Sequence, residues 1–516
     1  MNEPALQSPK LAALAAAALL IAPAPAAPAA AQEGPAAPPA PAAARPPGPE
    51  SPRMIEQRRR IEAHWIASRA GPPPPRDPPR PELGVELLPV DTRAAIAFSK
   101  ELGARPEPPA PAAAQRIPVP PPPPFQVPPP ACPTHLPYAG ALPPMKTASV
   151  VKAFPDLAWH ICVTDMGRKG LWVGPVQLRR GTSGPWMPVL YQAGLADIFV
   201  PYHLDTSFRP YDLHWTQGLS PISLQDVGAQ GSRIWLSNET FPTVAYEVRD
   251  RGVGWLCKGN VYSATRRGQE LVLWGVSDAG NYDNIIEFGF RDDGSMSFRT
   301  GNTGFNSPAN PVEPHTHNAL WYVDMDLNGS PGDSAATLTH SEPAPPAPPL
   351  TAVDPRLPFS IEGMRPWNPQ QLTTLLVEDN ATTAFGNRLG YEFAPLQNAL
   401  TRHYGWMEDW THNDLYVTRY NYADTVWASP VSPWHYPDEY LLPAVNGQPA
   451  QGQDLVLWVK TAAHHVPTDE DRANSDLTAV PQGMNGITLT HWSGFQAQPH
   501  NLFNANPLGG PPRCGV

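Results

Sequence analysis

Three histidines, two of them one residue apart, are the side chains of this sequence best suited to bind a metal ion. His315-Thr316-His317 is a His-x-His pair, and His464-His465 follows much later in the chain. On a β-strand, residues i and i+2 project from one face, so the two imidazoles of such a pair can bind a single ion. Tyr282, in Gly280-Asn281-Tyr282-Asp283-Asn284, precedes them. Each feature is weak alone, because a lone tyrosine in a strand usually packs in a core.

Three aspartates on the same two segments have even residue numbers, whereas His315, His317 and His465 have odd ones. Asp324 and Asp326 are even-numbered on the segment that begins at His315, and Asp454 lies eleven residues before His465. Regular strands would therefore gather three imidazoles on one face and three carboxylates on the other. Imidazoles suit Cu²⁺, whereas carboxylate oxygens suit Ca²⁺.

The order of these motifs resembles the copper amine oxidases, in which the tyrosine of Asn-Tyr-Asp/Glu is oxidised at its own copper site to a quinone. The resemblance implies that Tyr282 becomes topaquinone and that His315, His317 and His465 bind copper(II). His464 is the alternative third ligand, one residue away from the family spacing. The resemblance also implies a second cation, commonly calcium, bound by these side chains and backbone carbonyls: Asp324, Met325, Asp326, Asp454 and Leu455.

Other segments resemble the same family in the expected order. Ile198-Phe199-Val200-Pro201-Tyr202 resembles the strand whose tyrosine contacts the quinone, which implies this role for Tyr202. Asn238, in the family's Asn-Glu-Thr, places the catalytic aspartate upstream at Asp212, with Asp205 as the alternative. Together with a closing segment from Phe495 to Pro507, the resemblance covers residues 150–516.

The implied reaction is the oxidative deamination of a small primary amine by O₂ to an aldehyde, ammonia and H₂O₂. Asp212 would accept the proton from the amine α-carbon, while Asn281 and Tyr202 would orient the ring made from Tyr282. Homodimerisation is implied by the family alone, and Pro343–Pro349 falls in a candidate intersubunit arm.

Several features depart from the family pattern. The stretch between Tyr282 and His315 is short, and Pro210 stands where the family often has an aromatic residue over the quinone. After His465, the family's Arg-x-Glu-Asp-x-Pro is replaced by Thr468-Asp469-Glu470-Asp471-Arg472. These differences leave the chemistry in place and leave the amine substrate open.

Composition divides the chain into three parts. Of 71 prolines, 38 fall in the first 150 residues. Residues 1–31 resemble a signal peptide, with an apolar run after Lys10, so we expect a periplasmic or secreted protein without a transmembrane span. Residues 32–146 form a Pro/Ala-rich, mostly disordered segment with short helices expected at Arg53–Ala70 and Val85–Leu102. Residues 147–516 form the expected catalytic domain.

The net charge of −11 argues against a nucleic-acid partner.

Short β-branched and aromatic runs predict an all-β fold, a large antiparallel β-sandwich, beyond residue 150. Asp292-Asp293-Gly294 predicts a hairpin turn. The four cysteines could pair after export, in a pattern that the sequence does not determine. The predicted strands are Trp159–Thr164, Leu171–Leu178, Ile198–Tyr202, Leu271–Val276, Ile285–Phe290, Met296–Arg299, Leu320–Met325, Leu415–Tyr420 and Leu455–Val459.

Two other classes of protein could carry the same residues. One is a catalytically silent β-sandwich that serves as a binding or structural module. The other is an extracellular β-sandwich with a structural metal, such as zinc, in the three-histidine site. The complete set of one tyrosine, three histidines and one aspartate favours the oxidase, since a silent relative should lose at least one member.

Overall fold

The computed structural model describes the chain in segments, all within one compact unit that spans residues 76–516. The signal peptide, the two helices expected in the Pro/Ala-rich segment, the arm at Pro343–Pro349 and the aspartates Asp205 and Asp212 lie outside the described residues. The described segments are 115–116, 129–132, 147–165, 170–181, 184–202, 208–209, 220–224, 232–234, 242–258, 263–279, 281–306, 312–339, 356–369, 372–397, 409–421, 437–471 and 486–509.

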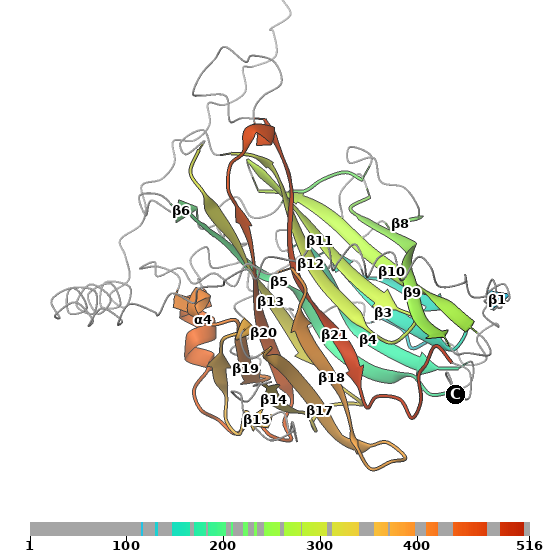
Figure 1. The fold of residues 1–516 in the computed structure, drawn as a ribbon. Coiled ribbons are helices and arrows are strands. Elements are labelled where there is room, and N and C mark those ends of the chain that lie inside the picture. The colour runs from blue at the N-terminus through green and yellow to red at the C-terminus, as the bar shows by residue number, and fades with distance from the viewer. Residues whose placement is uncertain are drawn as a thin grey trace, which may run out of the picture. The chain divides into compact units, whose positions relative to one another are not determined.

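Two large β-sheets form the fold, as the all-β prediction requires (Figure 1). The first is a 12-stranded sheet, in which β1 (Gln115–Arg116) and β7 (Ser220–Pro221) pair with β10 beside the main order. Its other strands, from one edge to the other, are β15 (Arg356–Pro358), β14 (Ser334–Leu338), β17 (Thr374–Thr382), β18 (Arg388–Pro395), β21 (Ile487–His500), β12 (Met296–Phe305), β11 (Tyr282–Arg291), β10 (Ser263–Asp278), β9 (Val244–Lys258) and β8 (Ser232–Ile234).

The second sheet has nine strands and, like the first, antiparallel neighbours along its order. The short β6 (Phe208–Arg209) pairs with β5 beside the main order. The other strands are β16 (Gly363–Arg365), β19 (Leu415–Arg419), β20 (Leu455–His465), β13 (His315–Met325), β5 (Met187–Pro201), β4 (Leu171–Arg180), β3 (Leu157–Asp165) and β2 (Thr147–Ala153).

Helices contribute little to the described part of the chain. They are two 3₁₀ turns, η3 (Asp409–His412) and η5 (Asp469–Asp471), and one α-helix, α4 (Pro437–Ala444). Among the described residues, no helix is both long and apolar enough to cross a membrane.

All nine predicted strands are present, and most are longer than their apolar runs suggested. The predicted strand Ile198–Tyr202, for example, is the end of β5, which runs for 15 residues from Met187 to Pro201, and Tyr202 follows it in an isolated β-bridge with His315. The predicted hairpin joins β11 to β12. Gly294 takes a positive φ of 87° in its turn, and the Arg291 amide donates to the Ser295 carbonyl. Apolar runs mark only the buried centre of each strand, so they underestimate its length.

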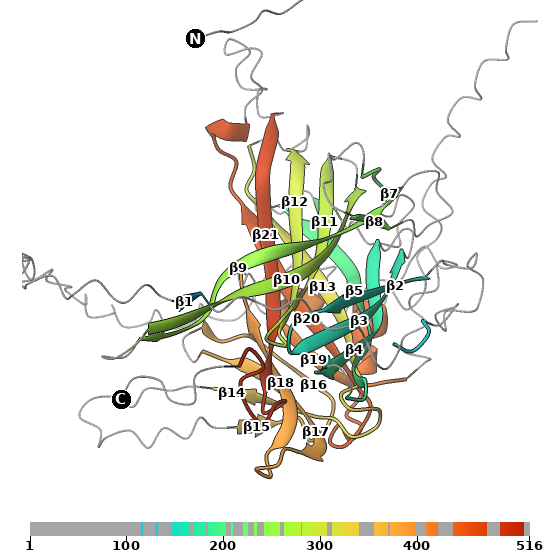
Figure 2. The same ribbon diagram turned by 90° about the vertical axis from the view of Figure 1, so that its right-hand side faces the viewer.

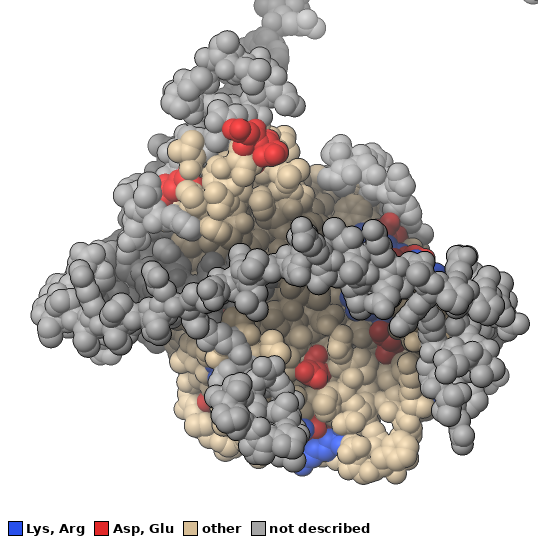
Figure 3. Space-filling view, in the orientation of Figure 1, with Lys and Arg blue, Asp and Glu red and all other residues tan. Residues whose placement is uncertain are grey.

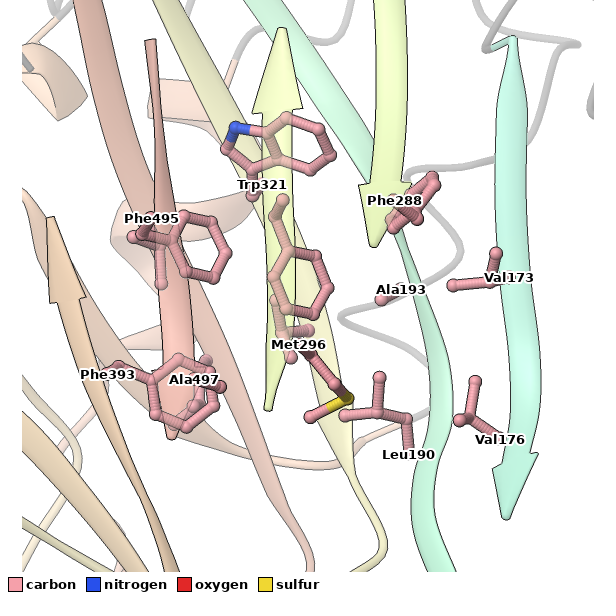
Figure 4. Packing of buried hydrophobic residues seen from close by; sticks show 14 of the residues in the cluster. Val173, Val176, Leu190, Ala193, Phe288, Met296, Trp321, Phe393, Phe495 and Ala497 are labelled. Carbon is pink, nitrogen blue, oxygen red and sulfur yellow. The ribbon is translucent and has the colours of Figure 1, made fainter. Parts of the chain in front are cut away.

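The main hydrophobic core lies between the two sheets (Figure 4). Trp321 of β13 packs edge-on against Phe288 of β11 and against Phe495 of β21, with ring centroids 5.7 and 6.0 Å apart. Phe495 also stacks on Phe298 of β12 at 4.6 Å. Such interlocked aromatic rings fix the position of one sheet relative to the other. This contact sets how β11, which begins at Tyr282, lies over β13, which begins at His315.

A smaller hydrophobic cluster covers the outer face of the nine-stranded sheet. Tyr322 of β13 and Trp458 of β20 contact each other edge-on, with centroids 5.0 Å apart. Leu441 of α4 and Trp410 of η3 belong to the same buried cluster. Strand β13 is therefore covered on both faces, and all 11 of its residues are buried.

A long hairpin of β9 and β10 lies next to β8, the short edge strand of the 12-stranded sheet. The turned view shows it running obliquely to β11, β12 and β21 (Figure 2). Its register shifts between Arg266 and Arg267 and again between Arg267 and Gln269. Such irregularities bend a strand and increase its twist, which accounts for the oblique course of the hairpin.

A disulfide connects the end of the Pro/Ala-rich segment to the nine-stranded sheet. Cys132 is bonded to Cys162 of β3, and Cys257 of β9 is also disulfide-bonded. The sequence had left this pairing open. The cross-link joins residues 30 apart and removes loop-closure entropy from the unfolded chain.

Candidate metal centre

The pairing of β13 with β20 determines which histidines meet. The antiparallel register runs without a shift from His315 opposite His465 to Asp324 opposite Val456. Because no bulge interrupts it, the parity expected from the sequence holds along both strands. The odd-numbered His315, His317 and His465 therefore face the space between the sheets, whereas His464 lies opposite Thr316 and is exposed.

The three odd-numbered histidines form a compact group of potential metal ligands. One ring nitrogen from each of His315, His317 and His465 lies within 4.8 Å of the others, and all three residues are buried. His315 Nε2 and His465 Nδ1 are 3.3 Å apart. Among the described residues, the other such group is Cys132, His160 and Cys162, whose cysteines form the disulfide.

One ring nitrogen in this group has no partner at all. His317 is 2% exposed, and its Nε2 is buried without a hydrogen bond. Buried polar atoms nearly always have a hydrogen-bond partner, so an unpaired nitrogen beside two other imidazoles indicates that this nitrogen serves as a metal ligand. A copper(II) ion between the three nitrogens would satisfy it, and a set of three imidazoles suits that ion.

The other two imidazoles are held so that their lone pairs face the centre. His315 Nδ1 lies 3.0 Å from the Glu313 carbonyl oxygen, so it donates its proton there and leaves Nε2 free to bind a metal. His465 Nε2 lies 3.0 Å from Asp471 Oδ2, which leaves Nδ1 directed to the centre. Such outer contacts fix the tautomer and the ring orientation of metal-binding histidines.

Burial also keeps the imidazoles of His315 and His317 neutral. Burial, opposed by the hydrogen bond to Glu313, lowers the pKa of His315 to about 4. Burial and the neighbouring His315 and His465 lower the pKa of His317 well below its usual value. Only the neutral imidazole has a lone pair for a metal, so His315 and His317 are in the ligand form at neutral pH.

Asp471 is a site residue that sequence reasoning missed, because Thr468–Arg472 was interpreted only as a departure from the family. Its Oδ2 contacts His465 Nε2 and also accepts the Thr468 amide at 2.8 Å. Asp471 is 2% exposed, whereas its neighbours Asp469 and Glu470 are exposed on η5, where acidic side chains gather (Figure 3). The available signal was the pair Glu470-Asp471, which retains the Glu-Asp of the family pattern.

The hydroxyl of Tyr282 lies against the same imidazole nitrogens. It is 3.0 Å from His315 Nε2 and 2.8 Å from His465 Nδ1, and the ring packs edge-on against His317 with centroids 4.5 Å apart. Burial, then the charges of Tyr202 and Asp471, raises the pKa of Tyr282 far above its usual value. The neutral phenol therefore occupies the space next to the three nitrogens, where a bound metal would act on it.

Tyr202 lies on the other side of His315. The two residues form an isolated β-bridge, and their rings stack at 4.7 Å with planes 30° apart. Tyr202 is 2% exposed. The structure therefore places Tyr202 against His315, which also contacts Tyr282, and the role of Tyr202 toward a quinone stays a prediction.

Asn281 fixes the backbone that presents Tyr282. Its Nδ2 donates to the Phe305 carbonyl at 2.7 Å, and its own carbonyl accepts the Phe305 amide at 2.8 Å. Gly304, opposite Tyr282, has a φ of 137°, and a Cβ there would lie 2.3 Å from the Asn281 carbonyl oxygen. Only glycine allows this close approach.

The aspartates predicted for a second cation lie toward the other end of β13. Asp324 is buried on the outer face, where its Oδ2 accepts the Tyr322 hydroxyl at 2.9 Å. Burial and the charges of Asp454 and Asp326 raise the pKa of Asp324 well above its usual value. Burial likewise raises the pKa of Asp326 to about 6.

The geometry of this second site is looser than that of the histidines. Among the described residues, the three carboxylates do not form a group whose ligand atoms all lie within 4.8 Å. Met325 and Leu455 are buried beside them, at the end of β13 and the start of β20. The calcium site formed by Asp324, Met325, Asp326, Asp454 and Leu455 thus remains a prediction.

Comparison with known sequences decides the family. A family profile described as "Copper amine oxidase, enzyme domain" matches residues 249–512, just over half of the chain. The chain belongs to the copper amine oxidase family.

Similar proteins of this family come from animals and plants. "Amine oxidase [copper-containing] 2" of Mus musculus is 26% identical over 277 residues, which is 46% of this chain and 34% of the mouse protein. "Amine oxidase [copper-containing] alpha 2, peroxisomal" of Arabidopsis thaliana is 22% identical over 68% of this chain and 58% of that protein. The chain therefore spans about a third to three-fifths of these copper amine oxidases.

Solved structures show the same fold. A copper-containing benzylamine oxidase from Hansenula polymorpha superposes with a TM-score of 0.52 at 14% identity, over 72% of this chain and 64% of that chain. An amine oxidase from Aspergillus nidulans gives a TM-score of 0.52 at 18% identity, over 72% and 56%. At these identities the likeness concerns the β-sandwich alone.

We expect His465→Ala to lose copper and His464→Ala to retain it. His465 contributes one of the three converging nitrogens, whereas His464 is exposed on the opposite face of β20. Copper content after dialysis, measured by mass spectrometry, tests this. Copper retained by His465→Ala and lost by His464→Ala would show that the register of β20 differs from the one described.

We expect Asp471→Ala to lower copper affinity by roughly 10- to 100-fold, as removal of such outer partners usually does. Asp471→Asn should lie between Asp471→Ala and the native protein, since an amide oxygen can still accept the His465 Nε2 proton. Competition with a copper chelator measures the affinity, and the nitrogen hyperfine pattern in electron paramagnetic resonance reports the orientation of His465. Asp469→Asn, an exposed change on the same turn, is the control. Equal affinity in all four proteins would contradict the role of Asp471.

Proposed function

We propose that this protein is a copper- and quinone-dependent primary-amine oxidase, which converts small primary amines and O₂ into aldehyde, ammonia and H₂O₂. The observation that carries the proposal is the hydroxyl of Tyr282, within 3.0 Å of nitrogens on both His315 and His465. A tyrosine packed in a core for its hydrophobic surface has no need of two imidazole contacts.

Three histidines would hold the metal. His315 and His317 would bind it through Nε2 and His465 through Nδ1, and all three residues are buried. Copper bound there would supply the redox chemistry with O₂ that oxidises the adjacent ring of Tyr282. The protein's part is to orient the imidazoles of His315 and His465, through Glu313 and Asp471, and to hold the phenol beside them, through Asn281.

Tyr282, once converted to topaquinone, would supply a carbonyl group and an electron sink for the amine. Tyr202 and Asn281 would restrict its position. Tyr202 stacks on His315, and Asn281 anchors the start of β11 to Phe305. A ring in such a pocket is pre-oriented for reaction, which lowers the entropic part of the barrier.

Asp212 is the proposed base that accepts the proton from the amine α-carbon, with Asp205 as the alternative. Both lie outside the described residues, so their assignment rests on the resemblance around Asn238. A carboxylate in a dry pocket is a stronger base than one in water, which suits this role near neutral pH.

The surroundings of the reaction are also proposed. The family supports a homodimer and a calcium ion at Asp324, Asp326 and Asp454. The Cys132–Cys162 disulfide supports a periplasmic or secreted location, since such bonds persist in oxidising compartments. A silent module with a structural metal is the less favoured function, because a purely structural ion would not need the phenol of Tyr282 beside its ligands.

We expect Tyr282→Phe to fold and to bind copper, yet to show neither quinone absorbance nor amine-dependent release of peroxide. The change removes the hydroxyl that faces the imidazoles and leaves the buried ring in place. Quinone staining and a peroxide assay over a panel of primary amines test this. Turnover retained by this variant would rule out Tyr282 as the source of the cofactor.

We expect Asp212→Asn to form the quinone and to react with a hydrazine but to turn over amines about 10²- to 10⁴-fold more slowly, the usual cost of losing a general base. Formation of the quinone needs copper, O₂ and Tyr282 but no base for the substrate. Steady-state rates and hydrazine titration are the measurements. If Asp205→Asn shows this behaviour while Asp212→Asn stays active, then Asp205 is the base.

A further inference from the structure

Asp333, the residue just before β14, has a fully buried carboxylate with no countercharge. Its exposure is 0%, and neither carboxylate oxygen has a hydrogen-bond partner. The backbone amide of Leu327 favours the ionised form of Asp333, although it forms no hydrogen bond of normal geometry with either carboxylate oxygen. A carboxylate without a partner is among the most unfavourable groups to bury, so its presence requires an explanation.

The topology places Asp333 between other carboxylates. On one side, Asp333 and Gln453 exchange two backbone hydrogen bonds of 3.0 Å, which bring Asp333 beside Asp454. On the other side, β14 pairs with β17 so that Ser334 lies opposite Glu378. The antiparallel register therefore places Asp333 across from Asp379, where two like charges would repel each other.

The carboxylate of Asp379 is directed to the same place. Asp379 is 5% exposed, and its Oδ2 lies 2.4 Å from the position that a Cβ on Gly332 would take. Its Oδ1 accepts the Ala381 amide and Asn328 Nδ2, at 2.7 and 3.3 Å. Burial, then the charges of Asp379, Asp326 and Asp454, raises the pKa of Asp333 to about 8.

No basic side chain balances this group. Among the described residues, neither lysine nor arginine forms an ion pair with Asp333, Asp379, Asp324, Asp326 or Asp454. Fully ionised, these five carboxyl groups would carry five negative charges, and a single divalent cation at Asp324, Asp326 and Asp454 would leave Asp333 and Asp379 without a countercharge. A divalent cation bound between Asp333 and Asp379 would supply the countercharge that they lack.

We propose that Asp333 and Asp379 bind a second hard divalent cation of the Ca²⁺ type, separate from the one implied at Asp324, Asp326 and Asp454. Asp379 belongs to the 12-stranded sheet, whereas Asp324 belongs to the nine-stranded sheet. A cation at Asp333 therefore lies where the two sheets are joined through Gln453, and it stabilises that junction. Carboxylate and backbone carbonyl oxygens are the ligands that calcium takes in proteins.

Calcium binding by the purified full-length protein tests the proposal. The protein is dialysed against EGTA and then against CaCl₂, and bound calcium per chain is measured by mass spectrometry together with copper. We expect two calcium ions in the native protein, one in Asp333→Asn, one in Asp324→Asn and none in the double variant. Asp156→Asn, an exposed change, is the control and should keep both.

Thermal unfolding with and without calcium gives a second measurement. Asp333→Asn removes a buried acidic group whose raised pKa makes folding less favourable at neutral pH, without changing the side-chain shape, so in EGTA this variant should be at least as stable as the native protein. Added CaCl₂ should raise its unfolding temperature less than it raises that of the native protein. Asp379→Asn should behave in the same way.

One result overturns the proposal: a single calcium ion in the native protein that Asp324→Asn removes and Asp333→Asn leaves in place. Equal effects of calcium on the unfolding temperatures of the native protein and Asp333→Asn would also overturn it. Neither result depends on copper, on Tyr282 or on amine turnover, so failure here is distinct from failure of the proposed function.

Discussion

The uninterrupted antiparallel pairing of β13 with β20 is the constraint on which the rest of the site depends. It places His315 directly beside His465 and, nine residues further along the same strand, Asp324 beside Val456. A shift by one residue would turn His465 outward and bring His464 inward, because strand side chains alternate with a period of two. Burial on both faces of β13 makes such a shift costly, since it would exchange two hydrophobic clusters at once.

The packing of the two sheets provides the remaining part of the site. Tyr282 belongs to the 12-stranded sheet and the three histidines to the nine-stranded one, so their contact exists only because the sheets pack face to face. Trp321, Phe288 and Phe495 fix that packing in the core. The proposed oxidation of Tyr282 would need this rigidity, because the ring and the metal ligands would have to be in place before any substrate arrives.

Burial has opposite electrostatic consequences at the two ends of β13. At the histidine end it favours the neutral imidazoles that a metal requires, and Glu313 and Asp471 fix their tautomers. At the aspartate end it raises the pKa values of Asp324 and Asp333, two acidic groups without a basic partner in the described part of the chain. The first end is a compact set of three imidazole ligands, and the second would be stabilised by the cations proposed there. Polar groups are buried at both ends of β13, and the hydrophobic packing of the surrounding sandwich must offset the free energy of desolvating them.

The sequence by itself determined the fold class, the nine strands and the family, because strand periodicity and motif order are local properties of the chain. Residue parity on a regular strand also predicted that His315 and His317 share a face, and the family resemblance named His465 as the third histidine, but the register of β13 with β20 decided that His465 rather than His464 joins them. Only the tertiary structure decided that the hydroxyl of Tyr282 meets two of those histidines, that Asp471 orients His465, and that Asp333 lies beside Asp454 and Asp379. Those contacts join residues of different strands and sheets, or arise where the chain turns back on itself. Their geometry follows from sheet packing and loop conformation, which no local pattern encodes.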